Sequence, residues 1–161
     1  MRSCSDVHNL LREAGVAHEI VQLPAVCSTA ARAAAALGVP LREVVKSLLF
    51  VADGAPVMVL VAGDASVDTT ALAAALGARE VRLARAHEVL EITGYRPGAV
   101  PPCALACDVP VVADPGALDP EVVYCGGGTT TTMLKIRSAD LERLVRPRRV
   151  AVARPARERE D

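Results

Sequence analysis

Two apolar runs on either side of a tight-turn dipeptide constrain the fold of this chain more than any other feature. Residues 44–52 and 56–62 are rich in Val and Leu, and Asp53 and Gly54 stand between them. An Asp-Gly pair tolerates the positive φ angles of a hairpin turn, so the pattern predicts two antiparallel strands joined directly. The core of the protein must therefore be built on a sheet.

Short helices and further strands surround this hairpin. Helices are predicted where apolar residues recur at helical spacing between a capping residue and a closing glycine, with Ser5 or Asp6 capping the first helix and Ser138 the last. The predicted helices cover residues 5–14, 28 or 29 to 37, 69–76, 85–94 and 138–145, and β-branched segments predict strands over 18–23, 79–84, 109–113, 121–125 and 129–136. Because these elements do not alternate strictly, we expect an α/β fold with a mixed, largely antiparallel curved sheet and short helices packed around it.

Composition indicates one compact domain. The chain has 161 residues, of which 52% are hydrophobic, enough to bury a sizeable core. We expect the domain to span residues 1–146 and the charge-rich segment 147–161 to be a flexible tail. The formal charge of −1 does not favour wrapping a long phosphate backbone, and three aromatic residues are too few for a series of base-stacking platforms. A general RNA-binding module is therefore disfavoured, and any nucleic acid should be gripped locally.

Nothing in the sequence predicts a membrane span, an export signal or a metal site. No stretch approaches the roughly 20 apolar residues of a spanning helix, and the start lacks the basic-then-apolar pattern of a signal peptide, so we expect a cytoplasmic protein. Its five cysteines are an odd, scattered set, which favours reduced thiols. Cys103 and Cys107 lack a second pair and a nearby histidine, so no metal or cofactor is expected. The three histidines accompany no catalytic triad motif.

A lysine interrupts the first strand of the hairpin. On a strand, alternate residues face the same side, so Lys46 shares a face with Leu48 and Phe50. An ammonium group among such neighbours must reach the rim of the sheet or find a partner. Two interpretations stay open: a lysine that extends to water, or a cation at the floor of a cleft that meets the carbonyl or phosphate of a ligand.

Two glycine-bearing loops bear on that choice. Residues 94–105 combine two glycines with three prolines, which stiffens the loop, and Gly98 permits close approach of a ligand. Residues 124–132 carry three consecutive glycines followed by hydroxyl residues, a pattern able to present backbone amides to an anion. Neither loop fits a phosphate-binding or dinucleotide fingerprint, and bare glycine loops are more often turns than sites.

The order of these motifs resembles the YbaK/ProX family of trans-editing aminoacyl-tRNA deacylases over residues 5–146. The most specific parts are the lysine in the VVKSL strand, Gly63 and Asp64 before a helix, the TGYRPGAVPP loop, and the late glycines with their closing helix. The resemblance implies a hydrolase that removes a mischarged small amino acid from the acceptor end of aminoacyl-tRNA, with a synthetase as a further partner and no metal. We expect a monomer that does not bind membranes. The alternative is a noncatalytic module of the same fold that binds a nucleotide or a synthetase.

The resemblance also implies the site residues. Lys46 and Gly98 are the catalytic pair, placed in the pocket that receives the aminoacylated terminal adenosine, with Thr29 and Ser47 beside them. An activated ester needs positioning and oxyanion stabilisation more than a protein nucleophile, so water can attack directly. The remaining substrate-binding residues implied by the family motifs are Pro102, Gly126, Gly127, Gly128 and Thr129, the last four as a turn that closes the amino-acid side of the pocket.

The sequence departs from the family pattern at four positions. Ala99, Cys103 and Ala104 replace two glycines and a phenylalanine of the proline loop, and Met133 stands where an acidic or small polar residue is usual. One branch of the family is specific for Cys-tRNA(Pro), and these changes argue against assigning that specificity to this chain. The edited amino acid and the tRNA stay open. They do not touch Lys46 or Gly98.

Overall fold

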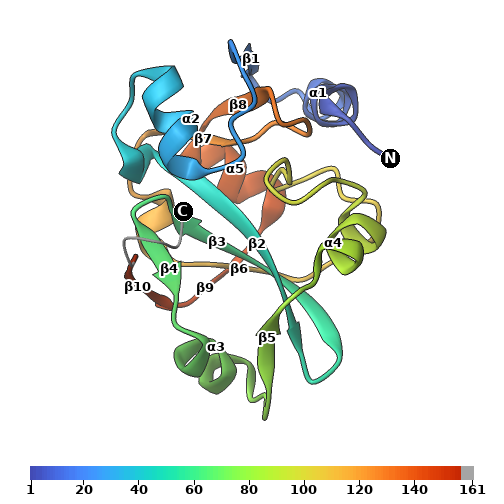
Figure 1. Ribbon diagram of the computed structural model, residues 1–161, viewed down its shortest axis with the longest axis vertical. Coiled ribbons are helices and arrows are strands. Elements are labelled where there is room, and N and C mark those ends of the chain that lie inside the picture. Colours follow the sequence, from blue (N-terminus) through green and yellow to red (C-terminus); the bar gives the residue numbers. More distant parts are fainter. Residues whose placement is uncertain (157–161) are drawn as a thin grey trace.

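The computed structural model of the protein describes residues 1–156 (Figure 1). The α-helices of these residues are α1 (Cys4–Glu13), α2 (Ala30–Leu37), α3 (Thr69–Leu76), α4 (Ala86–Thr93) and α5 (Ser138–Val145), with short 3-10 helices at Leu41–Glu43 and Pro115–Leu118. The strands are β1 (His18–Gln22), β2 (Val44–Ala52), β3 (Ala55–Ala62), β4 (Ala65–Val67), β5 (Val81–Leu83), β6 (Val111–Ala113), β7 (Val122–Gly126), β8 (Thr132–Arg137), β9 (Arg148–Arg149) and β10 (Ala153–Pro155). No helix among the described residues is long and apolar enough to cross a membrane.

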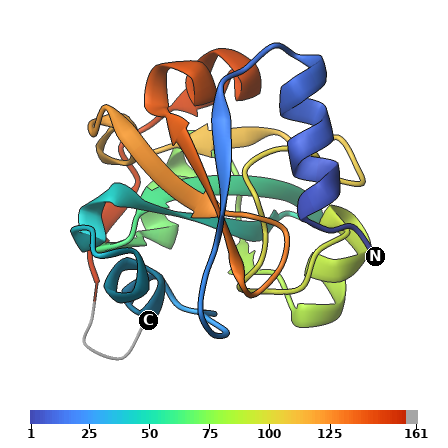
Figure 2. The ribbon, with the colours of Figure 1, turned by 90° about the horizontal axis from the view of Figure 1, so that it is seen from above.

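One mixed sheet dominates the molecule. Its strand order is β1-β8-β7-β2-β3-β6-β9, with β5 also paired to β2, and a separate small sheet joins β10 to β4. β2 runs antiparallel to β3 and parallel to β7, so antiparallel and parallel pairs meet at the centre of the sheet. Figures 1 and 2 show the short helices distributed around this sheet. The expected mixed sheet with helices around it is confirmed.

The β2–β3 hairpin forms as its sequence predicts. Asp53 and Gly54 both have positive φ angles, 47° and 83°. The Asp53 carboxylate also accepts hydrogen bonds from the backbone amides of Arg79 and Glu80, at 3.0 and 2.9 Å. These bonds lower the pKa of Asp53 and fix the turn against the chain that leads into β5.

The two faces of β2 belong to two different parts of the core. Val45, Leu49 and Val51 join the large cluster that includes side chains of α1, α4 and α5. Leu48 and Phe50 pack instead with Leu72 of α3 and the side chains around it. The side-chain alternation inferred for this strand is confirmed, and β2 separates the two clusters.

Two helix starts differ from the prediction. Ser3, rather than Ser5 or Asp6, caps α1. Its hydroxyl accepts a hydrogen bond from the Ser5 amide, and the Asp6 carboxylate accepts one from the Ser3 amide. Ser138 is the first residue of α5 and not its cap. Of the two predicted starts of α2, Ser28 and Thr29, the structure has Thr29 as the cap, which accepts from the Arg32 amide at 3.2 Å.

The flexible tail expected after Pro147 needs correction for the described residues. β9 pairs with β6, and β10 pairs with β4. Val152 is 1% exposed, and the Asp114 carboxylate accepts from the amides of Val152 and Ala153 at 2.9 and 3.0 Å. Apolar residues within this charged segment pack it against the sheet. The charge pattern alone does not predict this contact. Residues 157–161 lie outside the described part of the chain.

Candidate active site

The candidate site lies where the sheet leaves one edge of β2 uncovered. β3 pairs with β2 from Val45 to Ala52. On the opposite edge, β7 pairs only at Val44 and Val45, and β5 pairs only from Phe50 to Ala52. Within the described residues, 46–48 therefore have no strand neighbour on this edge. The proline loop enters beside this gap, because the Val100 carbonyl lies against Gly126 at the end of β7.

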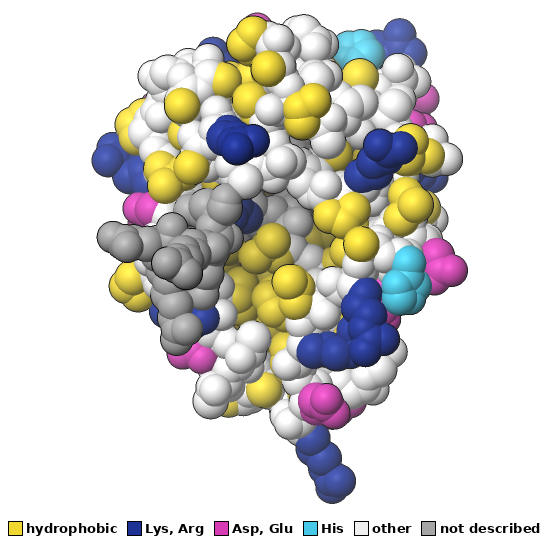
Figure 3. Space-filling model, in the orientation of Figure 1, with side chains coloured by type: hydrophobic (Ala, Val, Ile, Leu, Met, Phe, Trp, Pro, Cys, Tyr) yellow, Lys and Arg dark blue, Asp and Glu magenta, His cyan; other side chains and the backbone are white. Residues whose placement is uncertain are grey.

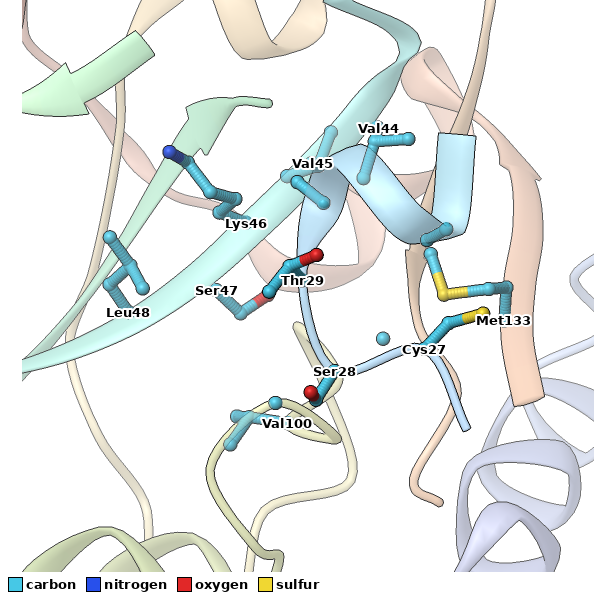
Figure 4. A pocket seen from close by; sticks show the side chains of 14 residues that line it. Cys27, Ser28, Thr29, Val44, Val45, Lys46, Ser47, Leu48, Val100 and Met133 are labelled. Carbon is cyan, nitrogen blue, oxygen red and sulfur yellow. The ribbon is translucent and has the colours of Figure 1, made fainter. Parts of the chain in front are cut away.

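A cavity of about 210 Å³ occupies this gap. Its walls come from the approach to α2, from the start of β2, from the proline loop and from the ends of β7 and β8. The lining residues are Cys27, Ser28, Thr29, Ala30, Ala33, Val44, Val45, Lys46, Ser47, Leu48, Gly98, Val100, Gly126 and Met133. Figure 4 shows how these side chains converge from separate segments of the chain.

The fold brings five of the nine predicted site residues to this cavity. Thr29, Lys46, Ser47, Gly98 and Gly126 all line it, although they come from four distant parts of the sequence. Pro102 is buried in the proline loop and does not line the cavity. Gly127, Gly128 and Thr129 are likewise absent from its walls.

The glycine turn after β7 packs closely against other backbone. The Gly127 amide donates to the Thr132 carbonyl at 3.2 Å, and the Gly128 amide donates to the Ala99 carbonyl at 3.0 Å. A Cβ at Gly128 would lie 2.8 Å from the backbone of Ser3 and Cys4. The expected anion-binding concavity is not formed by these two amides, because they hold the turn against the proline loop and against the start of α1.

Ser47 places a hydroxyl group at the cavity wall without a partner. Its Oγ atom is buried and makes no hydrogen bond within the described residues. Figure 4 shows this hydroxyl directed toward Thr29, whose own Oγ1 accepts the capping bond of α2. A buried hydroxyl without a partner is unfavourable by about 1–3 kcal/mol, so a ligand that bonds to it would gain that contribution.

Of the described residues that line the cavity, Lys46 alone has a charged side chain. It is half-buried, and Figure 4 shows it leaving β2 on the side opposite Ser47, as alternation along a strand requires. The two neighbouring side chains therefore leave β2 on opposite faces, and the Ser47 hydroxyl, not the Lys46 ammonium, is directed toward Thr29.

Gly98 lies at the mouth of the cavity in a conformation that favours glycine. Its φ angle is 85°, and an added Cβ would stand 3.1 Å from the Ser28 carbonyl oxygen. Among the described residues its amide donates no backbone hydrogen bond that would occupy it.

Several lining residues were not singled out from the sequence. Cys27 and Ser28 adjoin the predicted Thr29, and Val100 follows Gly98 by two residues, so proximity to a motif is the only signal they carry. Met133 was noted only as a departure from the family pattern. Its side chain closes the wall near Cys27 in Figure 4.

The cysteines and histidines do not assemble a metal site in residues 1–156. No three His, Cys, Asp or Glu side chains of this part of the chain come together as metal ligands. Cys103 is buried while Cys107 is exposed, and burial raises the pKa of the Cys103 thiol to about 12. Cys103 is a neutral core residue and not a reactive thiolate.

Comparison with known proteins identifies the family. The proline-tRNA ligases of Acidithiobacillus ferrooxidans and Lactobacillus johnsonii are 37% and 36% identical to this chain over 106 and 107 residues, 66% of the chain in each case but 18% and 19% of the ligases. The chain thus spans about a fifth of the length of these relatives.

Two solved structures match almost end to end. The hypothetical protein APE2540 superimposes with a TM-score of 0.87 at 32% identity, covering 92% of this chain and 99% of that one. A protein described as a candidate trans-editing enzyme for prolyl tRNA synthetase gives a TM-score of 0.87 at 29% identity, covering 94% and 96%. The family profile of the aminoacyl-tRNA editing domain matches residues 25–144, and the chain therefore belongs to that family.

Proposed function

We propose that this protein hydrolyses the ester of a mischarged aminoacyl-tRNA and so removes a small amino acid from the acceptor end. The observation that carries the proposal is that Lys46 and Gly98, far apart in sequence, line one cavity beside an uncovered strand edge. Membership of the editing-domain family supports the same substrate class. The chain would act in the cytoplasm, beside the synthetases that charge tRNA.

The polar groups around the cavity suit an ester that is already activated. In the proposed mechanism the Lys46 ammonium and the Gly98 amide hold the ester carbonyl and the terminal ribose. Both groups would stabilise the negative charge that develops on the carbonyl oxygen when water attacks the carbonyl carbon. The bond from that carbon to the ribose oxygen then breaks, releasing the free amino acid and a tRNA with its hydroxyl restored. No protein nucleophile is needed.

The size of the cavity favours a small amino acid. Its volume of about 210 Å³ is below the roughly 300–1,000 Å³ of pockets that hold drug-sized ligands. Met133, one of the four departures from the family pattern, lies in its wall, whereas Ala99, Cys103 and Ala104 do not. We propose that Met133 limits the side chain that can enter.

The surface around the opening supports contact with an anionic partner. Figure 3 shows this face hollowed over β2, with apolar side chains on the floor and Lys and Arg side chains spaced around the hollow. Asp and Glu side chains are also present on this face, so the figure gives the positions of the cations and not a net charge. A short acceptor end fits such a face better than a long duplex does.

Deacylation of charged tRNA tests the proposal. The purified protein is incubated with alanyl-, seryl-, cysteinyl- and threonyl-tRNA, and release of the amino acid is followed for the wild type and for Lys46→Ala. We expect turnover of at least one small aminoacyl group and a loss of about 100-fold in Lys46→Ala, the order found when one group that stabilises an oxyanion is removed.

The chain offers a matched control for this variant. Lys135 is its other lysine and lies 6.0 Å from the centre of the Tyr124 ring, away from the cavity lining. Lys135→Ala should keep wild-type turnover. Binding of all four charged tRNAs without any hydrolysis would replace the proposal with the noncatalytic module.

A further inference from the structure

Arg2 holds both ends of the proline loop. Its backbone amide donates to the Gly94 carbonyl at 2.8 Å, and its Nη1 donates to the Ala104 carbonyl at 3.2 Å. Its side chain also packs against Gly94: a Cβ added to Gly94 would lie 3.1 Å from the Cγ and Cδ atoms of Arg2. Arg2 thus contacts the first and the last turn of the segment that carries Gly98.

The residue that Arg2 holds at the far end has an unfavourable backbone. Ala104 has a φ angle of 59°, a left-handed conformation that a Cβ disfavours. It is the position where the family pattern has a glycine. The Ala104 carbonyl accepts two hydrogen bonds, one from Arg2 and one from the Tyr95 hydroxyl at 2.8 Å. Two donors on one carbonyl favour the conformation that alanine alone would avoid.

Tyr95 is a permanent donor in this arrangement. Its side chain is completely buried, and burial is the main cause that raises its pKa to about 12. The hydroxyl therefore keeps its proton throughout the neutral range. Arg2, in contrast, is only half-buried and reaches the loop from the segment before α1.

The same loop forms one wall of the candidate active site. Between the two points that Arg2 contacts, Gly98 lies against Ser28 and the Val100 carbonyl lies against Gly126. All four of these residues line the cavity. A shift of the loop at Ala104 would move Gly98 and Val100 relative to β2, where Lys46 and Ser47 are fixed by pairing with β3.

We propose that Arg2 is a positioning residue for the active site: together with Tyr95 it holds Ala104 in its left-handed conformation and so keeps Gly98 at the mouth of the cavity. Arg2 touches no substrate in this arrangement and acts through the loop. The activity readout of this inference rests on the proposed deacylase function, whereas its structural readout does not.

Arg2→Ala tests the inference. Removing the guanidinium is expected to increase hydrogen exchange in residues 94–105 while the β2–β3 hairpin stays protected, and to lower kcat/KM about tenfold, the order for one hydrogen bond from a charged donor. The loss should fall on kcat, because the loop amide is needed to stabilise developing charge. Arg2→Lys, which keeps a charged donor, should recover part of the lost kcat.

Arg12→Ala is the matched control, because Arg12 is an exposed arginine on α1. This variant should change neither the hydrogen exchange of residues 94–105 nor kcat/KM.

Ala104→Gly separates positioning from general stability. Glycine adopts the left-handed conformation without strain, so the effect of Arg2→Ala should be several-fold smaller in the Ala104→Gly background than in the wild type. Equal effects in both backgrounds would overturn the role assigned to Ala104. Unchanged exchange in residues 94–105 of Arg2→Ala would overturn the inference as a whole. If the wild type deacylates no tRNA, the proposed function fails while the exchange experiment still decides the role of Arg2.

Discussion

Substitution of Ser47 is expected to change substrate binding and thermal stability in opposite directions. Its hydroxyl is buried at the cavity wall and lacks a hydrogen-bond partner among the described residues, so the folded protein gains nothing from it. A substrate that donates to or accepts from this hydroxyl would relieve that deficit. Because this hydroxyl contributes no hydrogen bond to the fold among the described residues, we propose that it serves a ligand.

Ser47→Ala is expected to leave the melting temperature unchanged or slightly higher, because a buried, unpaired polar atom is removed. The same change should lower kcat/KM for deacylation about tenfold, the value of one hydrogen bond to the substrate. Ser66 is the matched control, since its Oγ atom is also buried and makes no hydrogen bond within residues 1–156, but lies in β4, outside the cavity lining. Ser66→Ala should show the same thermal behaviour with full activity. Equal activity of the two variants would remove Ser47 from the site.

Residue roles could be predicted only where the reason is local. The face on which Lys46 lies follows from alternation along one strand, and the sequence predicts it correctly. Gly127 and Gly128 are glycines for a different reason: their close neighbours are Thr132 and the backbone of Ser3 and Cys4, which are brought there by the tertiary fold. No pattern within the turn itself distinguishes a glycine that approaches a ligand from one that approaches another loop.

Element boundaries could be predicted where the signals are strong and the element is long. The β2–β3 hairpin and the start of α2 follow from Asp53-Gly54 and Thr29. β4, β9 and β10 were missed, whereas β5 and β6, which have three residues each, were predicted because they lie within longer β-branched segments. A strand of two or three residues without such flanking residues is too short to show a period of two.

The contact between β5 and α4 predicts a pH dependence of stability. Both terminal nitrogens of Arg82 in β5 donate hydrogen bonds to the Glu88 carboxylate, at 2.8 and 3.0 Å. The Arg85 amide donates a third to the same carboxylate at 2.9 Å. The hydrogen bonds from Arg82 are the main cause that lowers the pKa of Glu88 from 4.5 to about 2. A carboxylate with a lowered pKa stabilises the fold above its unfolded pKa and loses that contribution as the pH falls toward its folded pKa.

Glu88→Gln should therefore unfold at a lower temperature than the wild type at pH 7, and the difference should shrink as the pH falls from 4.5 toward 2. Thermal unfolding followed by circular dichroism across this range measures the effect. Glu91→Gln changes an exposed carboxylate on the same helix and should show no such trend. A difference between Glu88→Gln and wild type that persists unchanged at the acid end would assign the effect to packing rather than to charge.

At the scale of the whole molecule, the candidate active site depends on a gap in pairing along β2. The cavity exists because β7 and β5 pair with opposite ends of one strand edge and leave its middle to α2 and the proline loop. The four segments involved carry no mutual signal in the sequence, so only the resemblance to a family could group Thr29, Lys46 and Gly98 in advance. Local patterns predict the elements but not which of them leaves an edge open.

Asp114 is the buried group that ties the last described segment to this architecture. It follows β6 and is 9% exposed. One carboxylate oxygen accepts from the amides of Val152 and Ala153, and the other accepts from the Gly116 amide at 3.0 Å. Since Ala153 begins β10, which pairs with β4, this single side chain connects the large sheet to the small one.

Asp114→Ala would leave the buried Val152 amide and the partly buried amides of Ala153 and Gly116 without their acceptor. An unsatisfied buried amide is unfavourable by about 1–3 kcal/mol, so the free energy of unfolding in urea should fall by roughly 2–4 kcal/mol. Hydrogen exchange should rise selectively at residues 148–155, because β9 and β10 lose their anchor while β1, β7 and β8 keep their pairing partners. Asp119→Ala, an exposed carboxylate a few residues later, controls for the loss of charge and should be neutral. Undiminished protection of residues 148–155 in Asp114→Ala would show instead that apolar burial of Val152 alone holds this segment on the sheet.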